Sequence, residues 1–186
     1  MRALPFLMLL AVTTPAAAAQ RYVLDPAASA VSARVAFFGL SSKTARFPKM
    51  SGAIRLDPDR PEAAELDVTL DARALTAPDA TTLKRLKSEK FFWVERYPTV
   101  RFAGRGLRLS GAQSGTVTGT ITARGVTRPA TLAVTFAQPI PRSGPPRAIA
   151  LTGRTTIDRR AFGMTAYSLI VGRKVAITIR ARMVPG

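Results

Sequence analysis

The chain has 186 residues, of which 28 are Lys or Arg and 11 are Asp or Glu, so its formal net charge is +17. It contains no His and no Cys, which excludes Ser–His and Cys–His nucleophile pairs, thiolate catalysis, disulfides and cysteine-ligated metal centres. The length fits one domain with a sizeable core, and 47% hydrophobic residues is typical of a folded chain.

The N-terminus has the layout of an export signal. Arg2 supplies a positive start, residues 3–12 form an apolar run, and four alanines at 16–19 precede Gln20 as a small-residue cleavage site. The apolar run is interrupted by Pro5 and is shorter than the roughly 20 residues that a membrane-spanning helix needs. We therefore expect residues 1–19 to be a cleaved signal peptide and residues 20–186 to form a mature domain exported to the periplasm.

Alternation of apolar and polar residues dominates the mature chain. The clearest runs cover residues 31–37, 66–73, 131–136 and 174–183, and weaker runs cover 52–57, 99–109, 116–123 and 148–157. Because successive side chains of a strand point to opposite faces, each run predicts a strand with one apolar and one polar face. Eight or nine such strands separated by Gly and Pro indicate an all-β fold, either an antiparallel sandwich or a barrel.

One segment interrupts the strand pattern. Asp79 begins a run in which Leu83 and Leu86 share one helical face and basic residues occupy the other. This pattern predicts a short helix over about residues 79–90, which leads into the aromatic residues 91–93 and joins two halves of the sheet.

The positive charge is uneven along the chain. Residues 20–95 carry 12 basic and 10 acidic residues, whereas residues 96–186 carry 15 basic residues and Asp158 as their one acidic residue. Many of these cations occupy polar positions of strands, so a solvated outer face is one interpretation. The other is attraction to an anionic partner such as a phospholipid surface. We do not expect nucleic acid as a partner, because the chain is exported and no strand interleaves aromatic with basic residues.

No arrangement of residues favours an enzyme. Asp67 and Asp71 lie about 13 Å apart on one strand face, too far for a retaining carboxylate pair. The serines are accompanied by neither a Gly-x-Ser-x-Gly elbow nor a base, and Asp57-Pro58-Asp59 is better explained as a turn than as a calcium loop. We therefore predict no catalytic residue, no metal site and no enzymatic cofactor.

Segments along most of the mature chain follow an order found in one known family. They are Tyr22-Val-Leu-Asp-Pro26, Gly52-Ala-Ile-Arg-Leu-Asp57, residues 83–92 with Tyr97-Pro-Thr-Val-Arg-Phe102, Gly125-Val-Thr-Arg-Pro129 and Ile157-Asp-Arg-Arg-Ala-Phe-Gly-Met164. Together they resemble the YceI-like proteins, a periplasmic group associated with polyisoprenoid binding. The resemblance implies an extended lipocalin-like antiparallel β-barrel of about eight strands with a long internal apolar pocket. The chain departs from it at residues 38–40, where many members carry a His, so no role of that side chain carries over.

The resemblance further implies a non-catalytic carrier that holds an isoprenoid, an isoprenoid quinone or a similar long-chain lipid inside the barrel. The expected ligand-binding residues are bulky apolar side chains on inward faces, together with residues at the mouth or floor of the pocket: Val35, Phe37, Phe47, Leu86, Phe91, Phe92, Trp93, Phe102, Ile121, Phe136, Phe162, Met164 and Ile177. Basic residues near the mouth would face either a quinone oxygen or a phosphate. One rival interpretation is a basic protein that associates with anionic membrane lipid without an internal ligand, and another is a secreted protein with an unknown enzymatic step.

Overall fold

The computed structural model describes residues 19–140 and 145–186, so the predicted signal peptide lies outside the described residues except for Ala19. This part of the chain contains ten β-strands, one α-helix and three 3-10 turns. The strands are β1 (Gln20–Leu24), β2 (Ala30–Phe37), β3 (Ser41–Phe47), β4 (Met50–Leu56), β5 (Glu65–Asp71), β6 (Thr99–Leu109), β7 (Ser114–Ala123), β8 (Val126–Phe136), β9 (Ile149–Asp158) and β10 (Val171–Pro185). The helix is α1 (Ala80–Lys87), and the 3-10 turns are Pro61–Ala63, Ala72–Ala74 and Arg159–Phe162.

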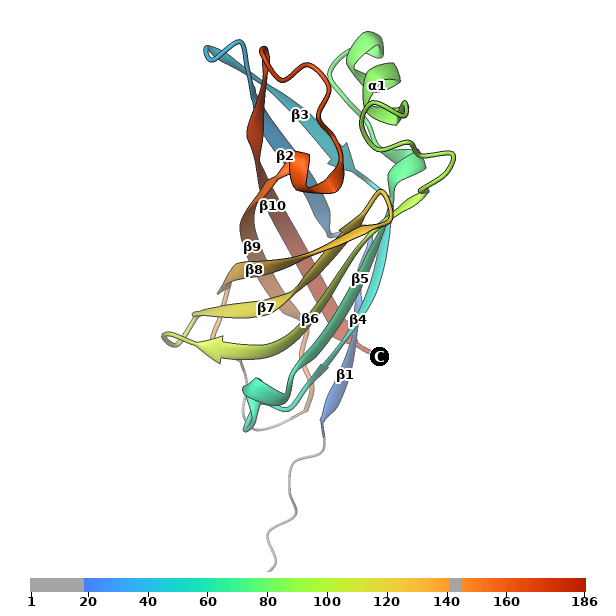
Figure 1. Ribbon diagram of the computed structural model, residues 1–186. Helices are drawn as coiled ribbons and strands as arrows, with labels where there is room; N and C mark the ends of the chain where they lie inside the picture. Colours follow the sequence, from blue (N-terminus) through green and yellow to red (C-terminus); the bar gives the residue numbers. More distant parts are fainter. Residues whose placement is uncertain (1–18, 141–144) are drawn as a thin grey trace, which may run out of the picture.

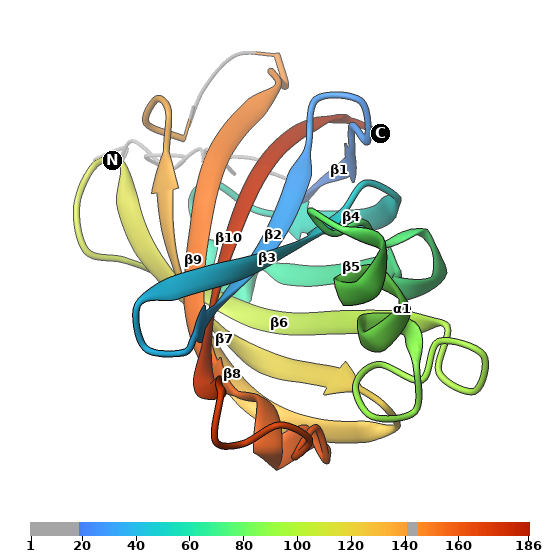
Figure 2. The ribbon, with the colours of Figure 1, turned by 90° about the horizontal axis from the view of Figure 1, so that it is seen from above.

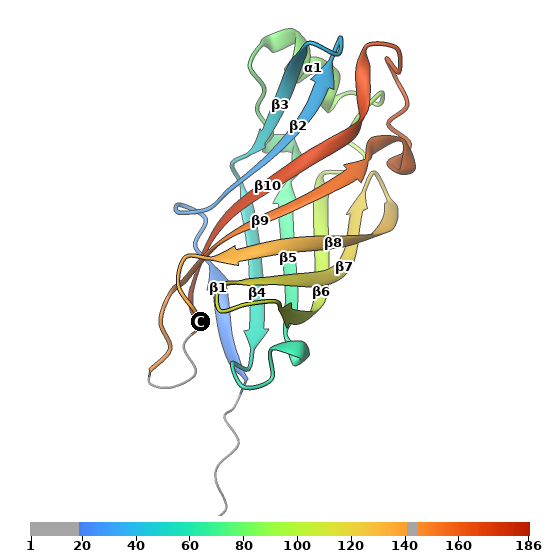
Figure 3. The ribbon, with the colours of Figure 1, turned by 90° about the vertical axis from the view of Figure 1, so that its left-hand side faces the viewer.

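Eight of these strands close into an antiparallel barrel (Figure 1). The hydrogen-bonded order β1-β4-β5-β6-β7-β8-β9-β10 returns to its start because β10 also pairs with β1. The first part of β10 continues beyond the ring and pairs with β2, which in turn pairs with β3. The β2–β3 hairpin and α1 therefore form an extension above the closed barrel (Figure 3). The predicted all-β barrel of about eight strands with one short helix is confirmed.

The barrel and its extension are joined along one edge of β10. β2 pairs with residues 171–180 of β10 and β1 pairs with residues 183–185, so the two short strands follow one another along the same long one. The break between them is held by Arg182, whose backbone N–H donates to Ser29 Oγ (3.0 Å) and whose guanidinium donates to Asp25 Oδ2 (3.1 Å). One continuous sheet thus carries both the barrel and the extension.

Three elements differ from the sequence prediction. No alternating run covers β1, because its apolar residues Tyr22, Val23 and Leu24 are consecutive. The alternation does not predict β3, because five of its seven residues are polar and its buried side chains are those of Ala45 and Phe47. The helix ends at Lys87, not near residue 90, because the backbone of Ser88 is extended (φ −70°, ψ 170°). The Ser88 N–H makes the last helical hydrogen bond, to the carbonyls of Lys84 and Arg85 (both 3.2 Å). The chain then turns inward, and Phe91 becomes buried.

Three apolar clusters fill the interior. One lies within the closed barrel and includes Tyr22, Leu132 and Phe136. A second lies between the β2–β3 hairpin and α1, whose Leu83 and Leu86 pack against it. The third joins residues of β7 to Phe91, Phe162 and Met164 at the upper end of the barrel. Among the described residues, no helix combines the length and the apolar character needed to cross a membrane.

Candidate functional site

The closed barrel encloses a cavity of about 140 Å³, here called the barrel cavity. Inward-facing side chains of the strands form its wall, which is apolar except at two positions among the described residues. Thr155 contributes a hydroxyl, and Arg101 points its guanidinium outward, where its Nε donates to Asp67 Oδ1 (2.9 Å). A dry apolar cavity of this size accommodates about one benzene-sized group.

A glycine pair shapes one side of this wall. Gly104 of β6 pairs with Gly119 of β7, next to the pair of Phe102 and Ile121. A Cβ at Gly104 would stand 2.8 Å from Phe102 Cε1, which is closer than carbon atoms approach one another. Glycine at this position therefore lets the Phe102 ring lie across the neighbouring residues and line the cavity.

A second cavity of about 170 Å³, the upper cavity, lies between the β2–β3 hairpin, α1 and the loop that precedes β10. Its apolar surface comes mainly from Val35, Phe37, Leu86, Phe91, Ile170 and Val171. Its polar rim comes from Lys43, Asp79, Thr81, Thr82 and Arg85. Both cavities are thus mainly apolar, and the upper cavity differs in having charged residues at its margin.

The rim of the upper cavity carries an excess of positive charge. Asp79 accepts from the Thr82 N–H (2.7 Å) and from Lys43 Nζ (2.9 Å), and these bonds lower its pKa from 3.8 to about 2. Asp79 therefore stays ionised and neutralises Lys43. Arg85 lies 5.3 Å from the centre of the Tyr167 ring and makes no ion pair with a described residue. The rim suits a hydrogen-bond acceptor or an anionic group.

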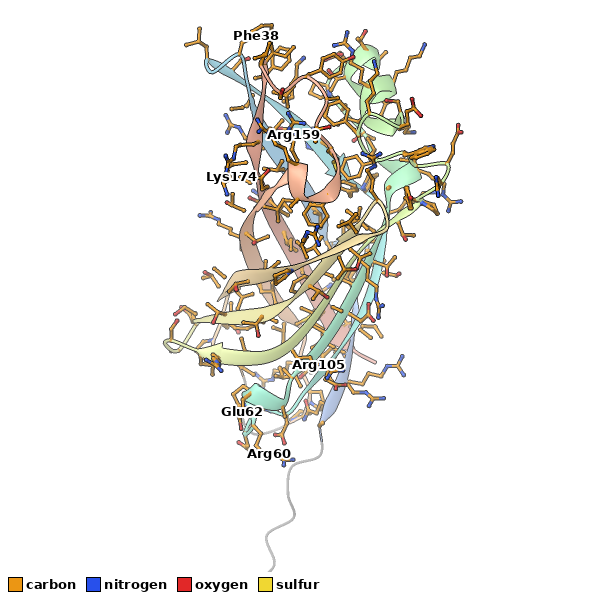
Figure 4. All side chains as sticks on the ribbon, viewed as in Figure 1. Phe38, Arg60, Glu62, Arg105, Arg159 and Lys174 are labelled. Atoms are coloured by element: carbon orange, nitrogen blue, oxygen red, sulfur yellow. The ribbon has the colours of Figure 1, made fainter. Side chains whose placement is uncertain are left out.

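A buried arginine fixes the loop that walls the upper cavity. The Arg159 guanidinium donates to the carbonyls of Gly172 (2.8 Å), Val171 (2.8 Å), Ala166 (2.9 Å) and Met164. Burial lowers the pKa of this guanidinium, although it remains charged at neutral pH. Figure 4 shows Arg159 at the base of the loop, where it holds residues 164–172 in place as a positioning group.

Twelve of the thirteen predicted ligand-binding residues divide into three sets. Four line the barrel cavity: Phe102, Ile121, Phe136 and Ile177. Four line the upper cavity: Val35, Phe37, Leu86 and Phe91. Four more, Phe47, Phe92, Phe162 and Met164, belong to the two clusters around the upper cavity, and the rings of Phe47 and Phe92 meet edge to face at 5.6 Å. Contact of any of them with a ligand stays a prediction.

Trp93 lies apart from both cavities. Its ring packs at 5.8 Å against that of Tyr97, and the Arg96 guanidinium lies 4.9 Å from its centre. The sequence prediction placed it with Phe91 and Phe92 because the three are consecutive. A left-handed φ of 48° at Trp93 turns its side chain away from its neighbours.

Several wall residues are missing from the predicted set. Tyr167, Ile170 and Val171 line the upper cavity, but most of their loop is irregular and gives no periodic signal. In the barrel cavity, Leu66, Leu132 and further inward aliphatic residues line the wall. The alternation of apolar and polar residues in the sequence already indicates that these aliphatic side chains point inward. The predicted set lacks them because it consists mainly of the bulkiest side chains.

Comparison with known proteins agrees with this architecture. A family model described as the YceI-like domain matches residues 22–183. A UPF0312 protein of Pseudomonas savastanoi pv. phaseolicola is 30% identical over 122 residues, and the match covers 64% of each chain. Protein YceI of Salmonella arizonae is 29% identical over 122 residues, which are 64% of this chain and 63% of that protein. The chain therefore aligns with less than two thirds of the length of these relatives.

Solved structures share the fold. BcnA of Burkholderia cenocepacia superposes with a TM-score of 0.76 at 24% identity, covering 86% of this chain and 98% of BcnA. A polyisoprenoid binding domain from Saccharophagus degradans, implicated in plant cell wall breakdown, gives a TM-score of 0.66 at 15% identity. The match covers 89% of this chain and 98% of that domain. At these identities the likeness concerns the barrel itself. Since the family model spans residues 22–183 of the 186, the protein belongs to the YceI-like family.

Proposed function

We propose that this protein is a non-catalytic carrier that binds one long, slender lipid, an isoprenoid or an isoprenoid quinone, with its apolar tail inside the barrel. The observation that carries this proposal is the apolar wall of the barrel cavity, which lies beneath an upper cavity with a charged rim. The polyisoprenoid binding domain that shares the fold supports this ligand class.

Burial of the tail supplies the affinity. Each CH₂ group moved from water into an apolar interior contributes about 0.8 kcal/mol before ordering of the tail is subtracted. An apolar tail has no hydrogen-bonding group, so no hydrogen bond is lost when it moves from water to a wall without polar groups.

The size of the cavities requires side chains to move when a long tail binds. The barrel cavity of about 140 Å³ is smaller than the roughly 300–1,000 Å³ typical of ligand pockets. Phe91 lines the upper cavity, Ile177 lines the barrel cavity, and both belong to one apolar cluster that Phe92 also contacts. Rotation of these side chains is the step by which the two cavities would join into one channel.

The rim would hold the polar end of the lipid. Lys43 and Arg85 are cations at the rim of the upper cavity, and Thr81 and Thr82 add hydroxyl groups. Both a phosphate and a quinone oxygen accept hydrogen bonds from such groups, so the rim chemistry fits either one. Asp79, the carboxylate at this rim, is ionised and engaged with Lys43 and Thr82, which leaves it unsuited to act as a base.

The proposed site of action is the periplasm. The export layout of residues 1–19 and membership of the YceI-like family support this location. A carrier in an aqueous compartment must shield an apolar tail from water, and the closed ring of eight strands suits that role.

Native mass spectrometry tests this function. The full chain would be expressed with its own leader, purified from the periplasm without detergent, and extracted with solvent after the native mass is recorded. We expect a stoichiometric adduct that extracts as an isoprenoid. A bare mass from cells of several lipid compositions would contradict the proposal and favour the rival interpretation, in which the basic surface binds membrane lipid and the barrel has no ligand.

A further inference from the structure

The exposed large hydrophobic side chains of the described residues gather on two neighbouring loops. Phe38 (62% exposed) and Leu40 (99%) lie in the β2–β3 turn, and Leu169 (100%) lies in the loop before β10. The Phe38 N–H donates to the Ile170 carbonyl at 2.8 Å, which holds the two loops together. These three side chains form what we call the apolar tip, and Figure 4 shows Phe38 at the end of the molecule remote from Glu62.

The backbone of the tip is unfavourable for a bulky residue. Phe38 has a left-handed φ of 52° and the following Gly39 a φ of 71°. Asn and Gly adopt this conformation readily, whereas a bulky side chain does so at a cost. A strained and exposed Phe contributes little to the stability of the fold, and it therefore indicates a contact outside the chain.

Cations lie at the same end of the molecule as the tip (Figure 1). Helix α1 and the residues directly after it carry Lys84, Arg85, Lys87 and Lys90, with Glu89 as the one acidic residue of this stretch. Viewed from above, α1 lies on the right, the β2–β3 turn on the left and the loop before β10 at the bottom (Figure 2), and side chains of α1, of the β2–β3 hairpin and of this loop line the upper cavity. At the other end, the turn over residues 57–65 carries four acidic residues and a single basic one. The molecule thus presents a basic end with apolar side chains and, remote from it, an acidic turn.

We propose that the apolar tip is a membrane-docking element, which inserts into the interface of an anionic lipid bilayer while the cations of α1 contact the headgroups. Apolar side chains over a basic belt are the combination that binds such interfaces. A protein partner fits less well, because stable interfaces bury about 800 Å² on each side and three side chains on two narrow loops offer no such flat area.

This inference goes beyond the proposed carrier function, since docking does not depend on what the barrel contains. Its geometry nevertheless has a consequence for that function. Phe37, adjacent to Phe38, lines the upper cavity, and the two rings contact each other edge to face at 4.6 Å. Docking through the tip would bring the rim of the upper cavity to the membrane surface.

Cosedimentation with vesicles tests the proposal. The full-length mature protein is expected to bind phosphatidylglycerol vesicles and to bind phosphatidylcholine vesicles more weakly. Loss of one buried Leu lowers partitioning by about tenfold, so the double variant Leu40→Ser/Leu169→Ser should bind about a hundredfold more weakly. Phe38→Asn should bind about tenfold more weakly while its thermal midpoint stays equal or rises, because Asn accepts the left-handed conformation.

Matched variants separate docking from diffuse attraction. Lys84→Gln on α1 should weaken binding by about fivefold, the value for one cation near a membrane surface. Arg105→Gln removes another exposed cation, one near the other end of the molecule (Figure 4), and should leave binding unchanged. Ala112→Leu adds an exposed leucine to the β6–β7 turn and should also change nothing.

The following results would overturn the proposal. One is an absence of binding to phosphatidylglycerol vesicles. Another is an equal loss of vesicle binding in Lys84→Gln and Arg105→Gln with no loss in the double variant Leu40→Ser/Leu169→Ser. That result would mean that net charge alone attracts the protein to the vesicles. A third is binding to native membranes that protease treatment of those membranes abolishes, which would identify a protein partner. Each readout is independent of a lipid in the barrel, so failure here leaves the carrier function standing.

Discussion

Filling the barrel cavity should stabilise the protein and abolish tail binding. Ala181 lies on the inward face of β10 and lines the cavity, and Ala181→Phe would place a benzene ring in a space of benzene size. At about 24 cal/mol for each Å³, a cavity of 140 Å³ corresponds to an upper bound of about 3 kcal/mol of lost stability in the ligand-free protein. Filling substitutions commonly recover part of such a loss, so we expect a gain of about 1–2 kcal/mol.

Thermal unfolding and native mass spectrometry measure the two effects. For a chain of this size, the gain should raise the melting temperature by about 2–8 °C, while the isoprenoid adduct disappears. Ala176→Phe is the control, because Ala176 is exposed on the outer face of the same strand and its substitution should preserve the adduct. An Ala181→Phe protein that binds the lipid as the wild type does would refute an internal tail. A lower melting temperature would refute the size and position assigned to the cavity.

Three further changes test the supports of the site. Arg159→Met should cost about 3 kcal/mol or more, because buried carbonyls lose their donors, and protease cleavage within residues 163–172 should become faster; an unchanged cleavage rate would contradict the anchoring role. Asp79→Asn should lower the melting temperature at neutral pH. Because the pKa of Asp79 is lowered from 3.8 to about 2, the difference in melting temperature between variant and wild type should shrink as the pH falls from about 4 towards 2. A difference that does not depend on pH would contradict this. Gly104→Ala should cost about 1–3 kcal/mol, because the new Cβ meets the Phe102 ring at 2.8 Å, and wild-type stability in denaturant would show that the ring moves freely.

The barrel strands could be predicted from the sequence because the alternation that identifies them is a local property of the chain. In β10, residues 177, 179, 181 and 183 alternate with Thr178, Arg180 and Arg182, and the structure turns these four apolar residues inward, where they line the barrel cavity. The alternation of side chains along a strand is a property of the backbone and needs no tertiary information. It therefore predicts both the strand and the face that lines the cavity.

The remaining features depend on contacts that local patterns do not record. β3 is polar because it lies in the extension, and it forms through its pairing with β2. Arg159 resembles a surface residue in the sequence, yet its guanidinium is buried by the carbonyls of a loop that follows it. The upper cavity combines residues from β2, α1 and the loop before β10, so only the folded chain reveals it.

The dependence of affinity on tail length tests most directly whether the lipid lies inside the barrel. Dissociation constants would be measured for prenyl alcohols of increasing length with the wild-type protein and with Ala181→Phe. An internal tail predicts that the affinity of the wild-type protein rises with each added isoprene unit until the tail spans both cavities, and that Ala181→Phe, whose barrel cavity is filled, shows no such rise. Affinities that do not change with tail length, or that change equally in both proteins, would contradict it.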